Sequence, residues 1–155
     1  MAVYATTGCK IYIGGQGVLA SESSWVEIGE VSNLGEFGDV FENVTFQALS
    51  ANRVKKTKGT ANAGDISLEM GHDPDDLGQA ALKSANDDTS SIAYNFKVEF
   101  TDAPNTPSGE TPTLVTFKAL VMGYRYNIGA ANNTITVSST LGITTALTVT
   151  APSST

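Results

Sequence analysis

The chain has 155 residues, of which 41% are hydrophobic and 16% charged, so it can fold as one domain, spanning 1–155, with its own core. Its formal net charge is −7, which argues against general nucleic-acid binding because that function needs a basic surface. The one cysteine, Cys9, cannot form a disulfide within the chain, and no apolar run approaches the roughly 20 residues that span a membrane.

The first part of the chain predicts a short arm followed by β-strands. Residues 1–8 are uncharged and extended in character, so we expect an N-terminal arm outside the core. Residues 11–13 (Ile-Tyr-Ile) predict a short strand that ends in a glycine-rich turn, and a second strand begins at 18–20. The glycines lack the lysine and following helix of a phosphate-binding loop.

The stretch 25–70 organises the rest of the chain. Its centre, at 50–64, is polar, basic and rich in small residues, whereas its flanks alternate between apolar and polar positions. Val44 and Phe46 mark the apolar face of the incoming strand, and Ile66, Leu68 and Met70 mark that of the outgoing strand. The pattern predicts a hairpin with an oversized arm at about 47–64. Because most connections in compact domains have about 4–6 residues, this arm is expected to act outside its own domain.

Charges of opposite sign are separated along this stretch. The chain has 9 Lys and Arg residues, and the arm contains a dense basic group with one amide: Asn52, Arg53, Lys55, Lys56 and Lys58. An acidic belt precedes it: Glu27, Glu30, Glu36, Asp39 and Glu42. Two such patches favour head-to-tail contact between copies, which closes into rings or extends as a filament. Ordinary surface charge on a solvated loop explains the pattern about equally well.

A helix is predicted over residues 73–86. Asp73 fits the N-cap and Pro74 the first helical position, and Leu77, Ala81 and Ala85 form one small apolar stripe. His72 and the acids after it match no zinc or EF-hand spacing, so no metal site is expected.

Strands fill the remainder of the chain. Residues 92–101 form the clearest one, with Tyr94, Phe96, Val98 and Phe100 facing inward. Residues 102–112 are a proline-rich surface loop, and 113–124 predict a long strand covered on both faces. Shorter strands are expected at 134–138, 141–143 and 147–149, and residues 150–155 form a flexible C-terminus.

Catalytic chemistry is not indicated. A single histidine and a single cysteine stand 63 positions apart, and the carboxylates fall in turns, a helix cap and wet strand faces. We therefore expect no enzymatic activity and no cofactor.

A family resemblance enters through the residues Trp25-Val26-Glu27-Ile28-Gly29. They lead through turns at Gly35 and Gly38 into a strand, a long loop, a return strand and a single helix. This order resembles the signature region of siphophage major tail tube proteins, and the likeness extends from about Tyr4 to Val149. Together with the strand patterns it implies a mainly β fold: a two-sheet β-sandwich or flattened barrel with one packed helix and a long hairpin arm.

The resemblance also implies a function. Such a chain is a structural virion protein of the phage tail, assembled in the host cytoplasm into rings of six copies that stack into a hollow tube. DNA passes through without specific binding, and the partners are further copies, the tape-measure protein, the tail terminator and tail-tip proteins, with no membrane. The polar faces of the strands beside the arm would line the channel: Asn43, Thr45, Gln47, Asp65, Ser67 and Glu69. The alternatives are a β-sandwich binding or adhesion module and a capsid decoration protein.

Overall fold

The structure is a computed structural model that describes residues 3–16, 25–102 and 110–154. Over these residues the chain is mainly β with one helix. The elements are β1 (Lys10–Gln16), β2 (Val26–Ile28), β3 (Val31–Asn33), β4 (Val40–Phe46), β5 (Lys55–Asn62), β6 (Asp65–Gly71), α1 (Leu77–Asp87), β7 (Tyr94–Glu99), β8 (Glu110–Thr111), β9 (Leu114–Asn127), β10 (Thr136–Ile143), β11 (Thr148–Thr150) and β12 (Ser153–Ser154).

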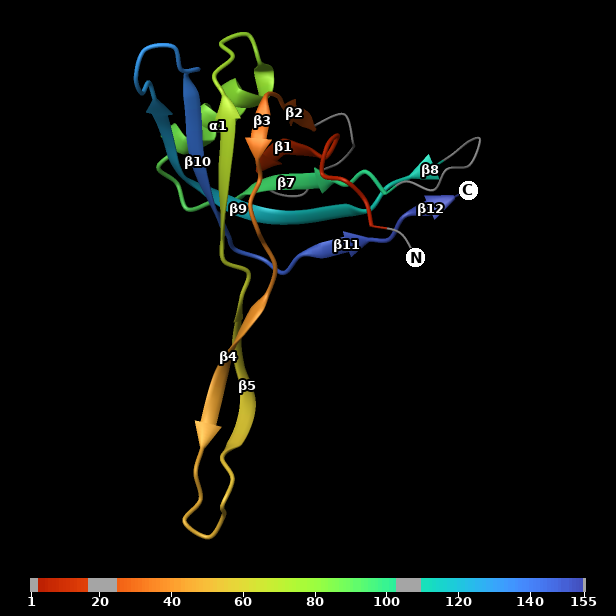
Figure 1. Cartoon of the computed structure of the whole chain (residues 1–155), viewed down its shortest axis with the longest axis vertical. Coiled ribbons are helices and arrows are strands. Elements are labelled where there is room, and N and C mark those ends of the chain that lie inside the picture. Colours follow the sequence, from red (N-terminus) through yellow and green to blue (C-terminus); the bar gives the residue numbers. More distant parts are fainter. Residues whose placement is uncertain (1–2, 17–24, 103–109, 155) are drawn as a thin grey trace.

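One long strand, β9, connects the two halves of the body. The large sheet has the order β2-β1-β7-β9-β10-β6-β3, and β11 also pairs with β9. Residues 114–119 of β9 pair with β7, whereas residues 119–127 pair with β10. Figure 1 shows β9 crossing beside β7 and then turning to lie beside β10, so that the two halves cover each other. The predicted mainly β sandwich with one helix is confirmed, and no barrel closes.

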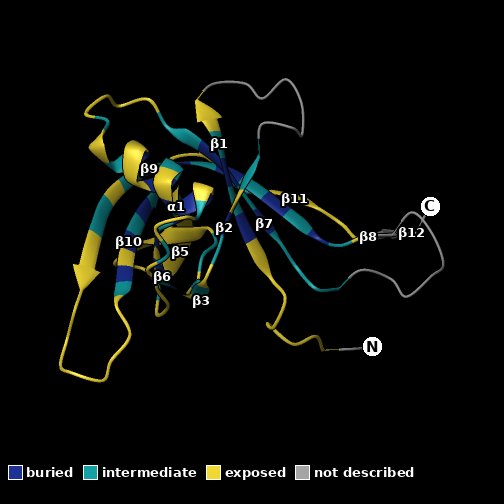
Figure 2. Cartoon of the chain, turned by 90° about the horizontal axis from the view of Figure 1, so that it is seen from above, coloured by how far each residue is buried: buried dark blue, intermediate teal, exposed yellow. Residues whose placement is uncertain are grey.

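The core lies between these halves. In Figure 2 the buried positions gather along β1, β7, β9 and β10, near the centre of the body. Ile66, Leu68 and Met70 of β6 are fully buried, as their alternation predicts, and Phe96 stacks on Phe117 with ring centroids 5.8 Å apart. Each large apolar side chain buried in this way contributes about 1.5–3 kcal/mol of transfer free energy.

Helix α1 begins later than predicted. Its N-cap is Asp76, whose carboxylate accepts from the Gln79 amide, so the expected N-cap at Asp73 is wrong. Asp73 instead closes a separate turn, in which its side chain accepts from the Asp75 amide. The predicted stripe is displaced as well, because Leu77 is exposed and the buried face carries Gly78, Gln79, Leu82 and Ala85.

Gln79 fixes the start of the helix to two other parts of the fold. Its side-chain amide donates to the carbonyl oxygens of Gly29 (3.1 Å) and Gly71 (2.8 Å), and its Oε1 accepts from the Asp73 amide (3.1 Å). The side chain is 2% exposed, so these three bonds satisfy a polar group that would otherwise be costly to bury. The helix thereby holds the β2–β3 turn against the end of β6.

The arm differs from the prediction in its pairing. The sequence pattern indicates strands near 44–46 and 66–70 joined by a long loop, but β4 pairs with β5 in a separate two-stranded sheet. Residues 55–62 are therefore strand and not loop, and β6 belongs to the large sheet. Figure 1 shows this β4–β5 hairpin projecting far below the body.

The remaining predictions concern the other strands and the two ends. Phe96 and Val98 point into the core as expected, and Tyr94 and Phe100 are half-buried. Residues 3–8 are exposed, while the predicted flexible end includes β12, whose backbone pairs with β8. The strand expected at 18–20, most of the loop at 102–112 and residues 1–2 and 155 lie outside the described residues. Within the described chain, no helix has the length and apolar character needed to cross a membrane.

Candidate assembly surfaces

The arm has two faces of different chemistry. Directly opposed residues of an antiparallel pair project to the same side. The apolar face of the arm consists of Glu42, Val44, Phe46, Lys55 and Thr57, and the basic face consists of Phe41, Asn43, Thr45, Lys56 and Lys58. All of these side chains are exposed, and Phe46 keeps 65% of its surface accessible. The expected dry side of the 44–46 strand is thus not buried by its own chain.

The basic side chains of the arm have no carboxylate partner within the described residues. The ion pair found there is Lys83–Asp87 on helix α1, at 3.2 Å. Lys58 instead lies 4.5 Å above the Phe41 ring, a cation–π contact within the hairpin. Asn52 and Arg53 are exposed in the turn that joins β4 to β5. The positive charge of the arm therefore faces solvent in a single copy.

The acidic belt is spread over several elements. Glu27 lies in β2, at one edge of the large sheet, and Glu30 precedes β3, which forms the opposite edge. Glu36 and Asp39 lie in the connection to β4, and Glu42 lies within the arm itself. All five are exposed, and they stand on different elements of one copy.

A polar face covers the half of the sheet formed by β3, β6, β10 and the end of β9. Asp65, Ser67 and Glu69 project from β6 on the side opposite to the buried Ile66, Leu68 and Met70. Opposite them in β10 stand Gly142, Thr140 and Ser138. Arg125 of β9 stands opposite Ser138 and therefore lies on the same side. The surface is thus built of small, hydroxyl-bearing and acidic side chains together with one arginine among the described strand residues.

The six residues expected to line a channel fall into two groups. Asp65, Ser67 and Glu69 share the polar face of the body, whereas Asn43 and Thr45 lie on the basic face of the arm. Gln47 follows in the arm's turn, where its side chain donates to the carbonyl oxygens of Ala48 and Ala51. The structure thus separates two sets of residues that the sequence pattern places on the two strands of one hairpin.

The opposite half of the sheet carries an aromatic and charged outer face. Lys97 lies 4.6 Å from the centroid of Tyr12 and 5.1 Å from that of Trp25. The Tyr12 hydroxyl donates to a Glu99 carboxylate oxygen at 3.2 Å. Burial, together with this neighbouring carboxylate, raises the pKa of Tyr12 to about 12. Trp25 is half-buried, so it serves as an edge anchor of this face.

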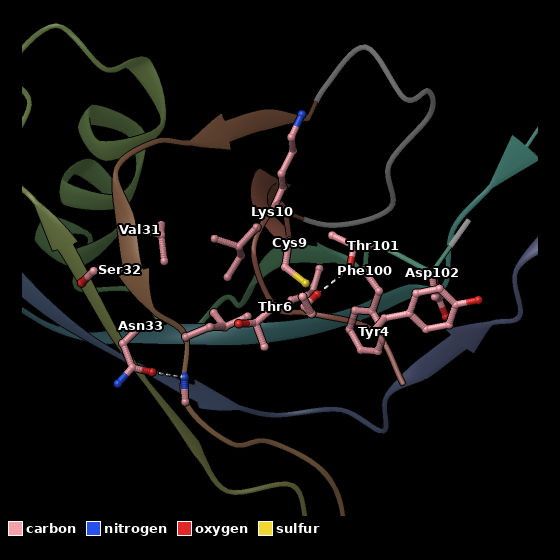
Figure 3. A pocket seen from close by; sticks show the side chains of 15 residues that line it. Tyr4, Thr6, Cys9, Lys10, Val31, Ser32, Asn33, Phe100, Thr101 and Asp102 are labelled. Atoms are coloured by element: carbon pink, nitrogen blue, oxygen red, sulfur yellow. Dashed lines mark hydrogen bonds between the residues drawn. The ribbon is translucent and has the colours of Figure 1, made fainter. Parts of the chain in front are cut away.

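An apolar pocket of about 450 Å³ opens between β1, β3 and the end of β7. Figure 3 shows Cys9 and Phe100 along it, with the Thr101 hydroxyl donating to the Ala5 carbonyl oxygen at 2.7 Å. Its lining provides one thiol but no histidine to activate it. Among the residues that the structure describes, no group of three or more His, Cys, Asp or Glu could hold a metal ion.

The large sheet also has strand edges without a described neighbour. Among the described strands, β3 pairs with β6 alone, and residues 120–127 of β9 pair with β10 but lie beyond the pairing with β7. Exposed strand edges and an uncovered apolar arm are features that other protein surfaces normally cover. They are surfaces suited to contact with further protein chains.

The chain belongs to the phage tail tube protein family, whose model matches residues 4–152. This is a family of structural phage proteins and not of enzymes, so the expected tail tube role is confirmed.

Solved structures show the same fold at low sequence identity. The tail of an empty gene transfer agent particle, refined with C6 symmetry, has a TM-score of 0.67 at 16% identity and covers 96% of this chain and 100% of that one. The SPP1 tail tube has a TM-score of 0.61 at 15% identity, covering 87% and 72%. A chain of the anti-feeding prophage baseplate has a TM-score of 0.71 at 14% identity, covering 97% and 98%. No curated protein matches the sequence.

Proposed function

We propose that this chain forms rings of six copies that stack head to tail into the hollow tail tube through which phage DNA passes. The observation that carries the proposal is the β4–β5 arm, whose strands are exposed at every position except Gly59 and, among the described residues, pair only with each other. Family membership favours this function over an adhesion module or a capsid decoration protein.

The arm is built for a partner. A two-stranded hairpin is marginally stable on its own in water, and this one leaves Val44, Phe46 and Leu49 exposed. Burying such side chains against a neighbouring copy would stabilise the contact by a free energy of about 25 cal/mol for each Å² of apolar surface covered. Ordering of the hairpin and assembly would therefore support each other.

Ring closure would use the free sheet edges. Each copy offers a half-sheet of four strands, β3, β6, β10 and the end of β9, with unpaired backbone groups at β3 and at residues 120–127 of β9. Pairing one edge with the other edge of a neighbour satisfies these groups and leaves no edge once the ring is complete. The C6 symmetry of the gene transfer agent tail supports the choice of six copies.

The polar face of this half-sheet is proposed as the channel wall. DNA carries about one negative charge per 1.7 Å of its axis, so a basic wall would bind its phosphates. On this face the two carboxylates of Asp65 and Glu69 outnumber the guanidinium of Arg125, so the wall would not bind the phosphates and DNA could slide past. Asn43, Thr45 and Gln47 would continue a polar surface toward the next ring.

Charge complementarity would guide the stacking. The basic group of the arm (Asn52, Arg53, Lys55, Lys56, Lys58) is proposed to meet acidic belt residues of another copy (Glu27, Glu30, Glu36, Asp39, Glu42). Their dispersal over one copy is compatible with contacts to more than one neighbour. Because each exposed pair contributes only about 0–1 kcal/mol, several must act together.

The remaining partners follow from the role. The tube would assemble in the host cytoplasm on a tape-measure protein and end at a tail terminator and at tail-tip proteins. A chain in a structure of a contractile-system sheath/tube terminator and a chain in a structure of a tube terminating cap share this fold, with TM-scores of 0.68 and 0.65.

The proposal is tested by removing the arm. Residues 41–61 are replaced by Asn-Gly, which joins Val40 to Asn62, a directly paired position. Because the apolar core contains no residue from this segment, the variant is expected to fold, with an unchanged circular dichroism spectrum. Electron microscopy should show tubes for the unmodified protein and none for the variant, and normal tubes from the variant would refute the proposal.

A further inference from the structure

A second uncovered apolar surface lies at the opposite end of the molecule from the arm. We define the terminal patch as His72, Tyr126, Ile128 and Ile135. The His72 and Tyr126 rings meet edge to face with centroids 5.6 Å apart, and the His72 amide donates to the Ile135 carbonyl oxygen at 2.9 Å. Figure 1 shows the end of β9 and its connection to β10 at the top of the long axis, and the arm at the bottom.

The terminal patch continues the core side of the sheet past the point where the body covers it. Tyr126 stands directly opposite Val137, which is fully buried, so both project to the core side. Ile128 and Ile135 lie two residues beyond these positions, at the period of the same face. Yet Tyr126, Ile128 and Ile135 are 51%, 61% and 42% exposed, and Figure 2 shows this end of β9 as exposed.

Acidic side chains flank the terminal patch. Asp73 and Asp75 lie one and three residues after His72. Burial raises the pKa of Tyr124, and the neighbouring Tyr126 and the Asp76 carboxylate raise it further. The ring centroids of Tyr124 and Tyr126 are 5.6 Å apart. The apolar face of the arm carries charges of both signs, because Lys55 stands opposite Phe46 and Glu42 lies on the same side as Val44. When two copies are placed end to end, the Lys55 ammonium group beside Phe46 is the charge that complements the carboxylates beside the terminal patch.

We propose that the terminal patch is the receptor for the arm of a copy in the adjacent ring, with Val44 and Phe46 covering Tyr126, Ile128 and Ile135. The inference rests on the proposed tube function and names the surface that the arm contacts. The two surfaces lie at opposite ends of one long axis, so stacking copies head to tail brings the arm of one copy onto the terminal patch of the next. Because each copy keeps one free surface of each kind, the stack does not close after two copies. The same contact, repeated between every pair of successive rings, allows the tube to grow without limit.

The first test weakens the terminal patch. Ile128→Ser with Ile135→Ser is compared with Ile92→Ser with Val149→Ser, a control in which both side chains are similarly exposed, at 57% and 62%. Both variants should retain the melting temperature of the unmodified monomer. Sedimentation should give a critical concentration for tube formation at least about tenfold higher for the patch variant and unchanged for the control, since about 1.4 kcal/mol corresponds to tenfold.

The second test joins the two surfaces covalently. In a Cys9→Ser background, Phe46→Cys with Ile128→Cys should form disulfides between successive copies when assembled tubes are oxidised. A non-reducing gel should then show a ladder of dimers, trimers and longer species, and Phe46→Cys with Ile92→Cys should show none. Unmodified protein that forms tubes while the patch variant assembles normally and no ladder appears would overturn this inference alone. Unmodified protein that forms no tubes would overturn the proposed function as well.

Discussion

Replacing Gly78 by alanine sets helix propensity against packing. Alanine favours a helix by about 1 kcal/mol over glycine, so propensity alone predicts a more stable protein. In the structure, however, a Cβ at position 78 would lie 2.1 Å from the Glu27 carbonyl oxygen and 2.5 Å from the Ile28 Cα. Both are backbone atoms of the β2 edge, which cannot rotate out of the way.

The magnitude follows from the distance that the helix must move. Non-bonded carbon atoms settle at about 3.5–4.0 Å, so α1 must retreat by at least roughly 1 Å, which loosens Leu82 and the Gln79 bonds. Overpacking of this kind costs about 1–3 kcal/mol, and backbone contacts on both atoms favour the upper end. Subtracting the propensity gain of about 1 kcal/mol leaves a net cost of about 2 kcal/mol, so at about 2–4 °C per kcal/mol the melting temperature should fall by about 4–8 °C.

Thermal unfolding of the dilute, unassembled protein, followed by circular dichroism, measures this change. Gly15→Ala is the matched control, because nothing lies within 4 Å of a Cβ built there. The control should melt at or slightly above the temperature of the unmodified protein. A Gly78→Ala protein that is as stable as the control, or more so, would show that α1 does not pack on β2 as described.

Two further predictions concern charge. Replacing Lys56 and Lys58 by Glu should raise the critical concentration for assembly severalfold, and raising salt from 0.1 to 1 M should weaken assembly of the unmodified protein, because the Debye length falls from about 10 to 3 Å; sedimentation that is indifferent to both changes would leave apolar contacts as the driving force. Asp65→Lys with Glu69→Lys should leave folding and tube formation intact, because both side chains are exposed, but should slow DNA ejection from particles; ejection kinetics equal to those of unmodified particles would argue against an acidic channel wall.

The sequence predicts best where a strand is covered by its own chain. The alternation at Ile66, Leu68 and Met70 indicates one dry face, and all three are fully buried because they belong to the apolar core between the two halves of the body. The same alternation at Val44 and Phe46 led to a different result. Periodicity shows that a strand face is apolar but not which segment or copy covers it. The sequence pattern therefore pairs the 44–46 strand with the 66–70 strand, whereas its partner in the structure is β5.

The helix start illustrates a second limit. Asp73 and Asp76 are equally good N-caps by residue type, and Pro74 favours the earlier one. The later start is selected by tertiary contacts: Gly78 fits against Glu27, and Gln79 binds Gly29 and Gly71. These partners are distant in the sequence from the helix, so no local sequence pattern predicts the contacts. The sequence does not predict the terminal patch either, because Ile128 and Ile135 flank an ordinary polar turn and their proximity in space depends on the pairing of β9 with β10.

The central claim is that this chain forms a tube whose channel is lined by the polar face of β6 and whose rings are joined by the arm. Cryo-electron microscopy of tubes assembled from the purified protein, with helical reconstruction, tests it most directly. We expect six copies in each ring, Asp65 and Glu69 facing the channel, and the β4–β5 arm of every copy in contact with the next ring. A reconstruction with β6 on the outer surface, or with the arm free in solvent, would contradict the account.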